Sequence, residues 1–124
     1  MTIKRIESSA RMSQAVVANG FVFLAGQIAP EPSGADVESQ TLQVLGEIDR
    51  LLAAAGTDKS RVVSATIYLA DIGTFAAMNR AWESWVVAGA QPARATVEAK
   101  LAAPEFRVEI QVVALEGDTR ARVP

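Results

Sequence analysis

The sequence predicts one α+β domain, in which a mixed sheet of about six strands is covered on one face by two helices. Its 124 residues, half of them hydrophobic, are the length of one ordinary domain. Two stretches, 37–55 and 71–87, repeat their apolar residues at helical spacing, and the remaining apolar stretches alternate as strands do. The resulting order is β-β-β-α-β-α-β-β, and no repeat or linker divides the chain. Residues 1–124 are therefore expected to fold as a single domain with a frayed tail at about 117–124.

The first third of the chain contains three predicted strands, at 3–7, 14–18 and 21–25. Asn19-Gly20 joins the last two. Both residues tolerate the positive φ angles of a type I′ turn, so this pair is a strong hairpin signal. Residues 30–34, rich in Pro and Gly, form a loop. Ser33 or Asp36 can then cap the helix that follows.

The first helix is predicted over 37–55 and ends at Gly56, because its apolar residues recur at helical spacing while polar residues fill the other face. The strand at 61–69 follows and alternates strictly. Alternation assigns one set to the helix side, namely Val63, Ala65, Ile67 and Leu69. It assigns the other set to the opposite face, namely Val62, Ser64, Thr66 and Tyr68.

The second helix is predicted between 71 and 87, with an apolar stripe of Phe75, Met78, Trp82, Trp85 and Val86. Tryptophans in such a stripe are expected to belong to the core. Two last strands, at about 93–100 and 106–115, are separated by a short linker that contains Pro104.

Alternation also predicts which way the charged residues of the last two strands point. Ala95 and Val97 are assigned to the helix side, so Arg94 should lie with Glu109 on the other face. Thr96 and Glu98 should point to the same face as Arg94. That face is half apolar and half polar, as in a homo-oligomer whose ligand pocket lies at the subunit boundary. An arginine and a glutamate on neighbouring strands are most often a surface or interface salt bridge, so spacing alone does not identify an enzyme.

Composition restricts the chemistry. The chain has no cysteine and no histidine, which removes disulfides, thiolate nucleophiles, imidazole bases and most zinc or copper ligand sets. The formal net charge of −2 disfavours binding to nucleic acid through a global field. No apolar signal core follows the N-terminus, and polar residues and glycines interrupt the apolar run at 15–29. A cytoplasmic protein that does not bind membranes is therefore expected.

Several short segments together resemble the reactive intermediate (enamine/imine) deaminase family, also called the YjgF/YER057c/UK114 family. They are Ala25-Gly26-Gln27-Ile28, residues 71–79, Gln91-Pro92-Ala93-Arg94, Val97-Glu98 and Val108-Glu109-Ile110-Gln111. Each segment alone is weak. The specific feature is Pro-Ala-Arg fifteen positions before the Val-Glu-Ile strand, after such a hairpin and two helices. The resemblance covers nearly the whole chain.

The resemblance implies a chorismate-mutase-like fold, assembled as a homotrimer whose three sheets form a central barrel with sites at the subunit clefts. It further implies hydrolysis of 2-imino or enamine acids to 2-keto acids and ammonia, without a metal or an organic cofactor. Arg94 would hold the substrate carboxylate and Glu109 would orient or activate water. The resemblance also implies roles for other positions in the substrate site. Thr96 would contribute backbone groups, Gly26 would lie beside the ligand, and Met12 and Ser13 would form the rim of the site. Asn79 matches a family position on the helix, either structural or functional.

The sequence departs from the best-known branch of this family in the residues around the implied site. Met12 replaces a tyrosine, Ala25 a serine, Thr96 a cysteine, and Gln111 a second glutamate. With the altered rim at Arg11 and Ser13, these differences indicate a sister subfamily. Two other functions remain open: a metabolite-binding or chaperone-like role for the same carboxylate cleft, and the endoribonuclease activity described for some relatives.

Overall fold

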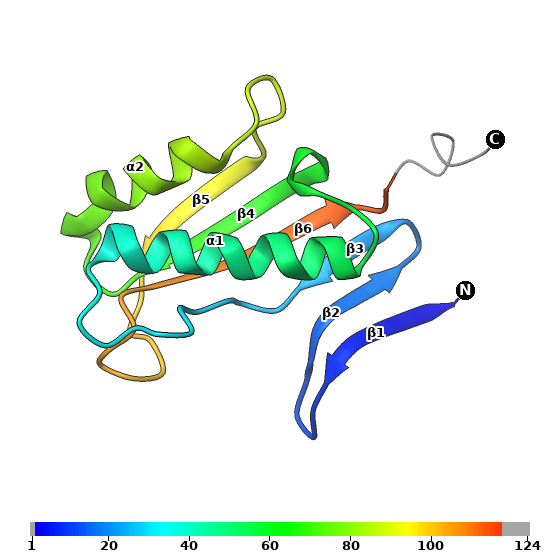
Figure 1. The fold of residues 1–124 in the computed structure, drawn as a ribbon, viewed down its shortest axis with the longest axis horizontal. Coiled ribbons are helices and arrows are strands. Elements are labelled where there is room, and N and C mark those ends of the chain that lie inside the picture. Colours follow the sequence, from blue (N-terminus) through cyan, green and yellow to red (C-terminus); the bar gives the residue numbers. More distant parts are fainter. Residues whose placement is uncertain (1, 118–124) are drawn as a thin grey trace.

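The protein is described by a computed structural model over residues 2–117, and the predicted order of elements is confirmed (Figure 1). The strands are β1 (Ile3–Ser8), β2 (Ser13–Ala18), β3 (Phe21–Leu24), β4 (Val62–Leu69), β5 (Ala93–Glu98) and β6 (Val108–Leu115). The helices are α1 (Val37–Ala54) and α2 (Phe75–Trp85), with short 3-10 turns η1 (Lys59–Arg61) and η2 (Ile72–Thr74). Apart from Gly117, the expected frayed tail lies outside the described residues.

The six strands form one mixed sheet in the order β1-β2-β3-β6-β4-β5. Only β4 and β5 pair in parallel, and all other neighbours are antiparallel. Strands β1 and β5 are therefore the two edges, and β6 lies inside the sheet. Both helices cover the same face, as predicted, which leaves the other face open in the single chain (Figure 1).

Local turn and cap signals behave as the sequence predicts. Asn19 and Gly20 adopt φ angles of 52° and 83° between β2 and β3, the left-handed pair that a type I′ hairpin needs. Asp36 caps α1, because its side chain accepts a hydrogen bond of 2.8 Å from the Ser39 backbone N–H. Gly56 has a φ of 81° just after α1.

The core lies between the helices and the middle of the sheet. Its fully buried side chains include Val44, Leu45, Ile48, Leu51, Leu52, Ile67, Leu69, Met78 and Ile110. Trp82 and Trp85 are each only 6% exposed, so the prediction that they belong to the core is confirmed. The Trp85 indole Nε1 donates a 2.9 Å hydrogen bond to Asp49 Oδ1, which joins α2 to α1.

Strict alternation was wrong at the start of β4. The pairing of β4 with β6 shifts register between Val62 and Ser64, which marks a β-bulge. A bulge places an extra residue in one strand and redirects the side chains on one side of it. Val62 is consequently 3% exposed and belongs to the core, whereas Val63, assigned to the helix side, is 41% exposed.

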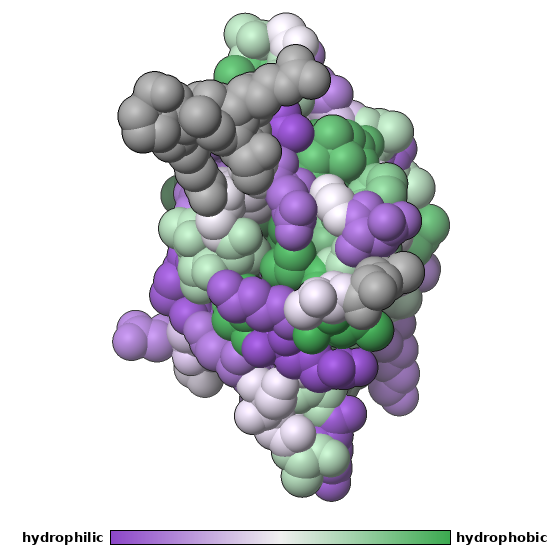
Figure 2. Space-filling model, turned by 90° about the vertical axis from the view of Figure 1, so that its right-hand side faces the viewer, coloured by the Kyte–Doolittle hydropathy of each residue, from purple (hydrophilic) through white to green (hydrophobic). Residues whose placement is uncertain are grey.

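The open face of the sheet is rich in apolar side chains. Phe21 and Phe23 are paired in register with Leu115 and Val113, and their rings lie 6.1 Å apart. Phe23 and Val97 are 44% and 43% exposed. At the end of the sheet where β2 turns into β3, by contrast, hydrophilic residues break up the apolar patches (Figure 2). None of the helices within residues 2–117 is both long and apolar enough to cross a membrane.

Candidate functional site

Arg94, the second residue of β5, lies beneath α2 and contacts three of its side chains. Its Nη1 donates a 2.7 Å hydrogen bond to Asn79 Oδ1. Its Cζ lies 5.6 Å from the centre of the Phe75 ring and 5.5 Å from the centre of the Trp82 ring. Both distances are within the range of cation–π attraction. Phe75, Asn79 and Trp82 fall on one stripe of α2 because they are spaced by four and then three residues.

This position contradicts the prediction that Arg94, Thr96 and Glu98 point away from the helices. In the β4–β5 register Arg94 is opposite Ala65 and Thr96 is opposite Ile67, and both partners are buried under the helices. Strand β5 is an edge strand, and its apolar residues Ala95 and Val97 lie exposed on the open face. Apolar character therefore does not mark the helix side of this strand.

Glu109 lies on the open face, as predicted. Its Cα is opposite that of Tyr68 in the β4–β6 pairing. The two residues line a hollow of about 280 Å³ together with Lys100, Leu101 and Gln111, and Ala99 and Ala102 complete its wall. The residues that line this hollow thus include a lysine, a tyrosine and a glutamine besides Glu109.

Gly26 lies directly against Glu109. A Cβ atom placed on Gly26 would lie 2.9 Å from the Glu109 carboxyl carbon and would overlap its Oε2. The loop is held there by two backbone hydrogen bonds between Gln27 and Ile110, of 2.8 and 3.0 Å. Glycine is therefore the residue that lets this loop approach the carboxylate.

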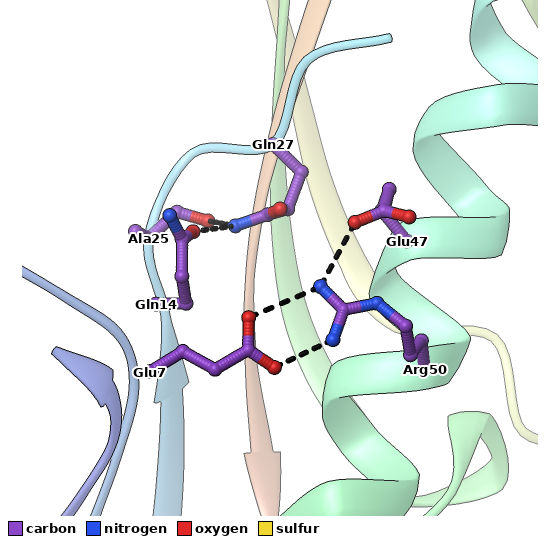
Figure 3. A network of polar contacts seen from close by, with 6 residues as sticks. All are labelled: Glu7, Gln14, Ala25, Gln27, Glu47 and Arg50. Carbon is purple, nitrogen blue, oxygen red and sulfur yellow. Dashed lines mark hydrogen bonds and ion pairs between the residues drawn. The ribbon is translucent and has the colours of Figure 1, made fainter. Parts of the chain in front are cut away.

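Side-chain contacts fix the same loop from the other side (Figure 3). The buried Gln27 amide donates to Gln14 Oε1 at 2.9 Å and to the Ala25 carbonyl at 3.0 Å.

Nearby, Arg50 on α1 forms ion pairs with Glu7 on β1 and with Glu47. Hydrogen bonding to this guanidinium lowers the pKa of the Glu7 carboxyl. The edge strand β1 is thereby fastened to the helix layer.

The remaining site residues predicted from the resemblance are not brought together in one chain. Met12 is 44% exposed between β1 and β2, and the Ser13 hydroxyl lies 2.8 Å from that of Ser8. This connection lies at the edge of the sheet opposite β5 (Figure 1). Thr96 lies on the same face of β5 as Arg94. Its buried Oγ1 has no hydrogen-bond partner within residues 2–117.

Arg94 and Glu109 are also separated, contrary to the predicted proximity. They lie on opposite faces of the sheet, on the two strands that flank β4. Their partners Ala65 and Tyr68 are three residues apart on β4, so the two Cα atoms are roughly 14 Å apart by ordinary strand geometry. A small ligand cannot touch both side chains within one chain.

Two groups of residues next to the candidate site residues were not predicted from the sequence. Phe75 and Trp82 were assigned to an apolar stripe, although their spacing around Asn79 is the signal that α2 offers one face to a cation. Tyr68 and Lys100 were not connected with Glu109 because the hollow depends on the loop at 99–102. Within residues 2–117 no cluster of three or more acidic side chains has the arrangement of a metal site.

The fold defines a class, that of small α+β proteins with two helices on one face of a six-stranded sheet. The sequence matches the family model described as Endoribonuclease L-PSP over residues 2–116. RutC family protein YoaB of Escherichia coli (strain K12) is 47% identical over 114 residues, which cover 92% of this chain and 98% of that protein. A RutC family protein of Haemophilus ducreyi is 46% identical over 112 residues, 90% of this chain and 95% of its own.

Solved structures agree with the sequence relatives. A member of the YjgF protein family from Neisseria meningitidis has a TM-score of 0.92 and 48% sequence identity, covering 95% of this chain and 98% of its own. A protein of the conserved Rid protein family from Yersinia pestis has a TM-score of 0.81 and 33% identity, covering 92% and 99%. The chain therefore belongs to the YjgF/RutC family, and the resemblance and the chorismate-mutase-like fold that it implied are confirmed.

Replacing Gly26 with alanine should displace the Glu109 carboxylate without unfolding the protein. The new methyl group meets only the far end of a flexible side chain, so Glu109 can rotate away at small cost. A crystal structure of the variant should show the carboxylate in a new position. Gly46→Ala is the matched control, because Gly46 has open space around it on α1. That change should leave Glu109 in place and stabilise the helix by about 0.5–1 kcal/mol. An unmoved Glu109 in Gly26→Ala would contradict the close packing described here.

Proposed function

We propose that this protein hydrolyses reactive 2-imino acids, and the enamines that tautomerise to them, to 2-keto acids and ammonia. The observation that carries the proposal is the state of Arg94. Its guanidinium is partly buried against two aromatic rings, yet none of the ion pairs within residues 2–117 includes it. An arginine held without a counter-charge is suited to bind a carboxylate through two parallel hydrogen bonds.

The reaction needs only the Arg94 guanidinium, the Glu109 carboxylate and a water molecule. In a 2-imino acid C2 is already electrophilic, and Arg94 would fix the molecule by its carboxylate. Glu109 would accept a proton from water as the water oxygen bonds to C2 and the C=N double bond becomes single. The same proton would then pass to the nitrogen, which gives a carbinolamine with one hydroxyl and one amino group on C2. Glu109 would next carry the hydroxyl proton to the amino group, so that the C–N bond breaks and C=O forms as ammonia leaves. Glu109 ends in its starting state, and imino acid plus water becomes keto acid plus ammonia.

The separation of Arg94 and Glu109 favours a site shared by two copies of the chain. Arg94 would come from one copy and Glu109, with its hollow, from the neighbouring copy. The exposed apolar face that surrounds Glu109, with Phe21, Phe23 and Val97, supports such an assembly because it is too apolar to remain open to water. The homotrimer with a central barrel, implied by the resemblance, is the assembly proposed.

The other predicted residues have places in this shared site. Thr96 lies two residues after Arg94 on the free edge of the sheet, where its backbone can reach a ligand. Gly26 gives the Glu109 carboxylate the space it occupies. Met12 and Ser13, at the opposite edge of the sheet, would form the rim of a site in a neighbouring copy.

A metabolite-binding role is the second candidate, because Arg94, which has no ion-pair partner within residues 2–117, would bind a carboxylate whether or not turnover follows. Ammonia release from an imino acid generated in the cuvette by an amino-acid oxidase separates the two roles. The family model is described as an endoribonuclease. Cleavage of RNA is less compatible with a chain that has no histidine and a net charge of −2. RNA incubated with rigorously purified protein should remain intact.

Assembly can be tested first. Light scattering at micromolar concentration should give about three times the 13.1 kDa chain mass, because the apolar open face is buried between copies. A monomer that is folded and stable at this concentration would contradict both the homotrimer and the shared site.

Arg94→Lys should be nearly as damaging as Arg94→Ala. Lysine keeps the positive charge but loses the planar fork that binds a carboxylate through two hydrogen bonds. Calorimetric binding of pyruvate or 2-oxobutyrate should be lost in both variants, while light scattering shows an unchanged oligomer. Retained ligand binding and ammonia release in Arg94→Ala, with only thermal stability reduced, would show that Arg94 has a purely architectural role.

Glu109→Gln should lower turnover by about 10²- to 10⁴-fold, the usual effect of a lost general acid or base, with little change in ligand affinity. The amide keeps the size of the side chain but cannot take a proton from water. Keto-acid formation from the freshly generated imino acid measures the effect. Wild-type turnover in this variant would remove Glu109 from the mechanism.

Mixing the two inactive variants tests whether the site is shared. When Arg94→Ala and Glu109→Gln chains are unfolded together and refolded, each mixed trimer should contain one site with both native residues. Random assembly should then restore about a quarter of the wild-type rate. If each site lay within one chain, no mixed trimer would contain an intact site and activity would stay absent.

A further inference from the structure

Three side chains of α2 hold Arg94, and none of them carries a charge. Phe75, Asn79 and Trp82, here named the α2 mount, place two rings and one amide oxygen around the guanidinium. Asn79 Oδ1 accepts a hydrogen bond from Nη1, one of the five N–H donors of an arginine side chain. The rings attract the cation through their π faces. The mount therefore fixes the guanidinium without neutralising it.

The mount is itself braced by the core. Trp82 is 6% exposed, and its ring lies 5.3 Å from that of Trp85. Trp85 in turn donates its indole N–H to Asp49 on α1. Two layers of buried aromatic contact thus connect the surface that touches Arg94 to the helix that packs across the sheet. Such support keeps a positioning group within a narrow range of orientations.

A different residue at position 79 would change the charge state of the cluster. Aspartate has the shape of asparagine and would place a carboxylate at hydrogen-bond distance from Nη1. The protein would then contain an internal ion pair in place of an available cation. An amide at this position holds Arg94 and still leaves it free to bind an external carboxylate.

We propose that Phe75, Asn79 and Trp82 are positioning residues that set the orientation of Arg94 and its affinity for a carboxylate. This inference rests on the proposed function only in taking Arg94 as the carboxylate anchor. The three residues do not need to touch the substrate. They act through the guanidinium, so their replacement should change substrate affinity more than the rate of the chemical step.

Asn79→Asp is the most direct test. Pyruvate affinity, measured by calorimetry on the assembled protein, should fall by about tenfold or more because the new carboxylate competes for Arg94. Thermal stability should stay the same or rise, and KM for the imino acid should increase more than kcat decreases. Asn79→Ser, which keeps an oxygen acceptor without charge, should bind pyruvate more tightly than Asn79→Asp. Ser84→Asp is the charge-matched control on an exposed flank of α2, and it should bind pyruvate as the wild type does.

The aromatic side of the mount is tested by a matched pair of tryptophan variants. Trp82→Leu and Trp85→Leu each remove one indole of equal burial from the same helix. Only the first removes a ring that faces Arg94, so it should weaken pyruvate binding by about two- to tenfold relative to Trp85→Leu. Equal affinity in two folded variants would show that Trp82 serves packing alone.

The outcomes separate this inference from the proposed function. If Arg94→Ala abolishes pyruvate binding while Asn79→Asp and Trp82→Leu bind like the wild type, the mount is overturned and the role of Arg94 stands. If Arg94→Ala itself binds pyruvate normally, both the positioning role of the α2 mount and the role of Arg94 as carboxylate anchor are overturned. Should Trp82→Leu fail to fold, Asn79→Asp decides, because an isosteric change at a half-buried position leaves the core intact.

Discussion

The packing of α1 and α2 on a single face of the sheet is the constraint on which the rest of this protein depends. It buries the inner sides of β4 and β6 completely and leaves their outer sides uncovered. Every side chain on those strands therefore belongs either to a dry layer under the helices or to an open surface. The two chemical groups of the candidate site fall on different sides of this division, Arg94 in the helix layer and Glu109 on the open face.

Each face suits the group that it holds. Under α2, Arg94 contacts two rings and an amide, and none of the ion pairs within residues 2–117 includes it. On the open face, Gly26 lies against the Glu109 carboxylate, and the loop at 99–102 lines a hollow together with Glu109. Among the residues that line this hollow, Glu109 is the only carboxylate, because Gln111 stands where the best-known branch of the family has a second glutamate. In the proposed reaction, Glu109 would therefore be the one carboxylate among these residues that can accept a proton.

The same division connects assembly with chemistry. An open sheet face bearing exposed phenylalanine and valine side chains would be stabilised by the contact with further copies of the chain that the proposed assembly provides. Contact of this kind is also the simplest way to bring an arginine from one face near a glutamate from the other. In the proposed assembly, one surface would therefore serve both oligomerisation and site formation.

Local signals in the sequence determined the elements and their order. Asn19-Gly20, the Asp36 cap and the helical spacing within α1 and α2 each depend on residues close in the chain, so their physics is complete without the fold. The alternation of β6 also placed Glu109 correctly, because that strand is inside the sheet and one of its faces must be buried. The resemblance to a family made Arg94 a candidate site residue, although periodicity assigned it to the wrong face.

Tertiary structure alone decided the face of Arg94, the bulge at Val62 and the hollow beside Glu109. Strand β5 is an edge that pairs only with β4 among the described strands, and its apolar residues lie on the face away from the helices. Alternation in an edge strand distinguishes two faces but does not say which one meets the helices. That choice is made by the register with β4 and by the α2 side chains that receive the guanidinium. Both involve residues distant in sequence, and no local pattern encodes their contact.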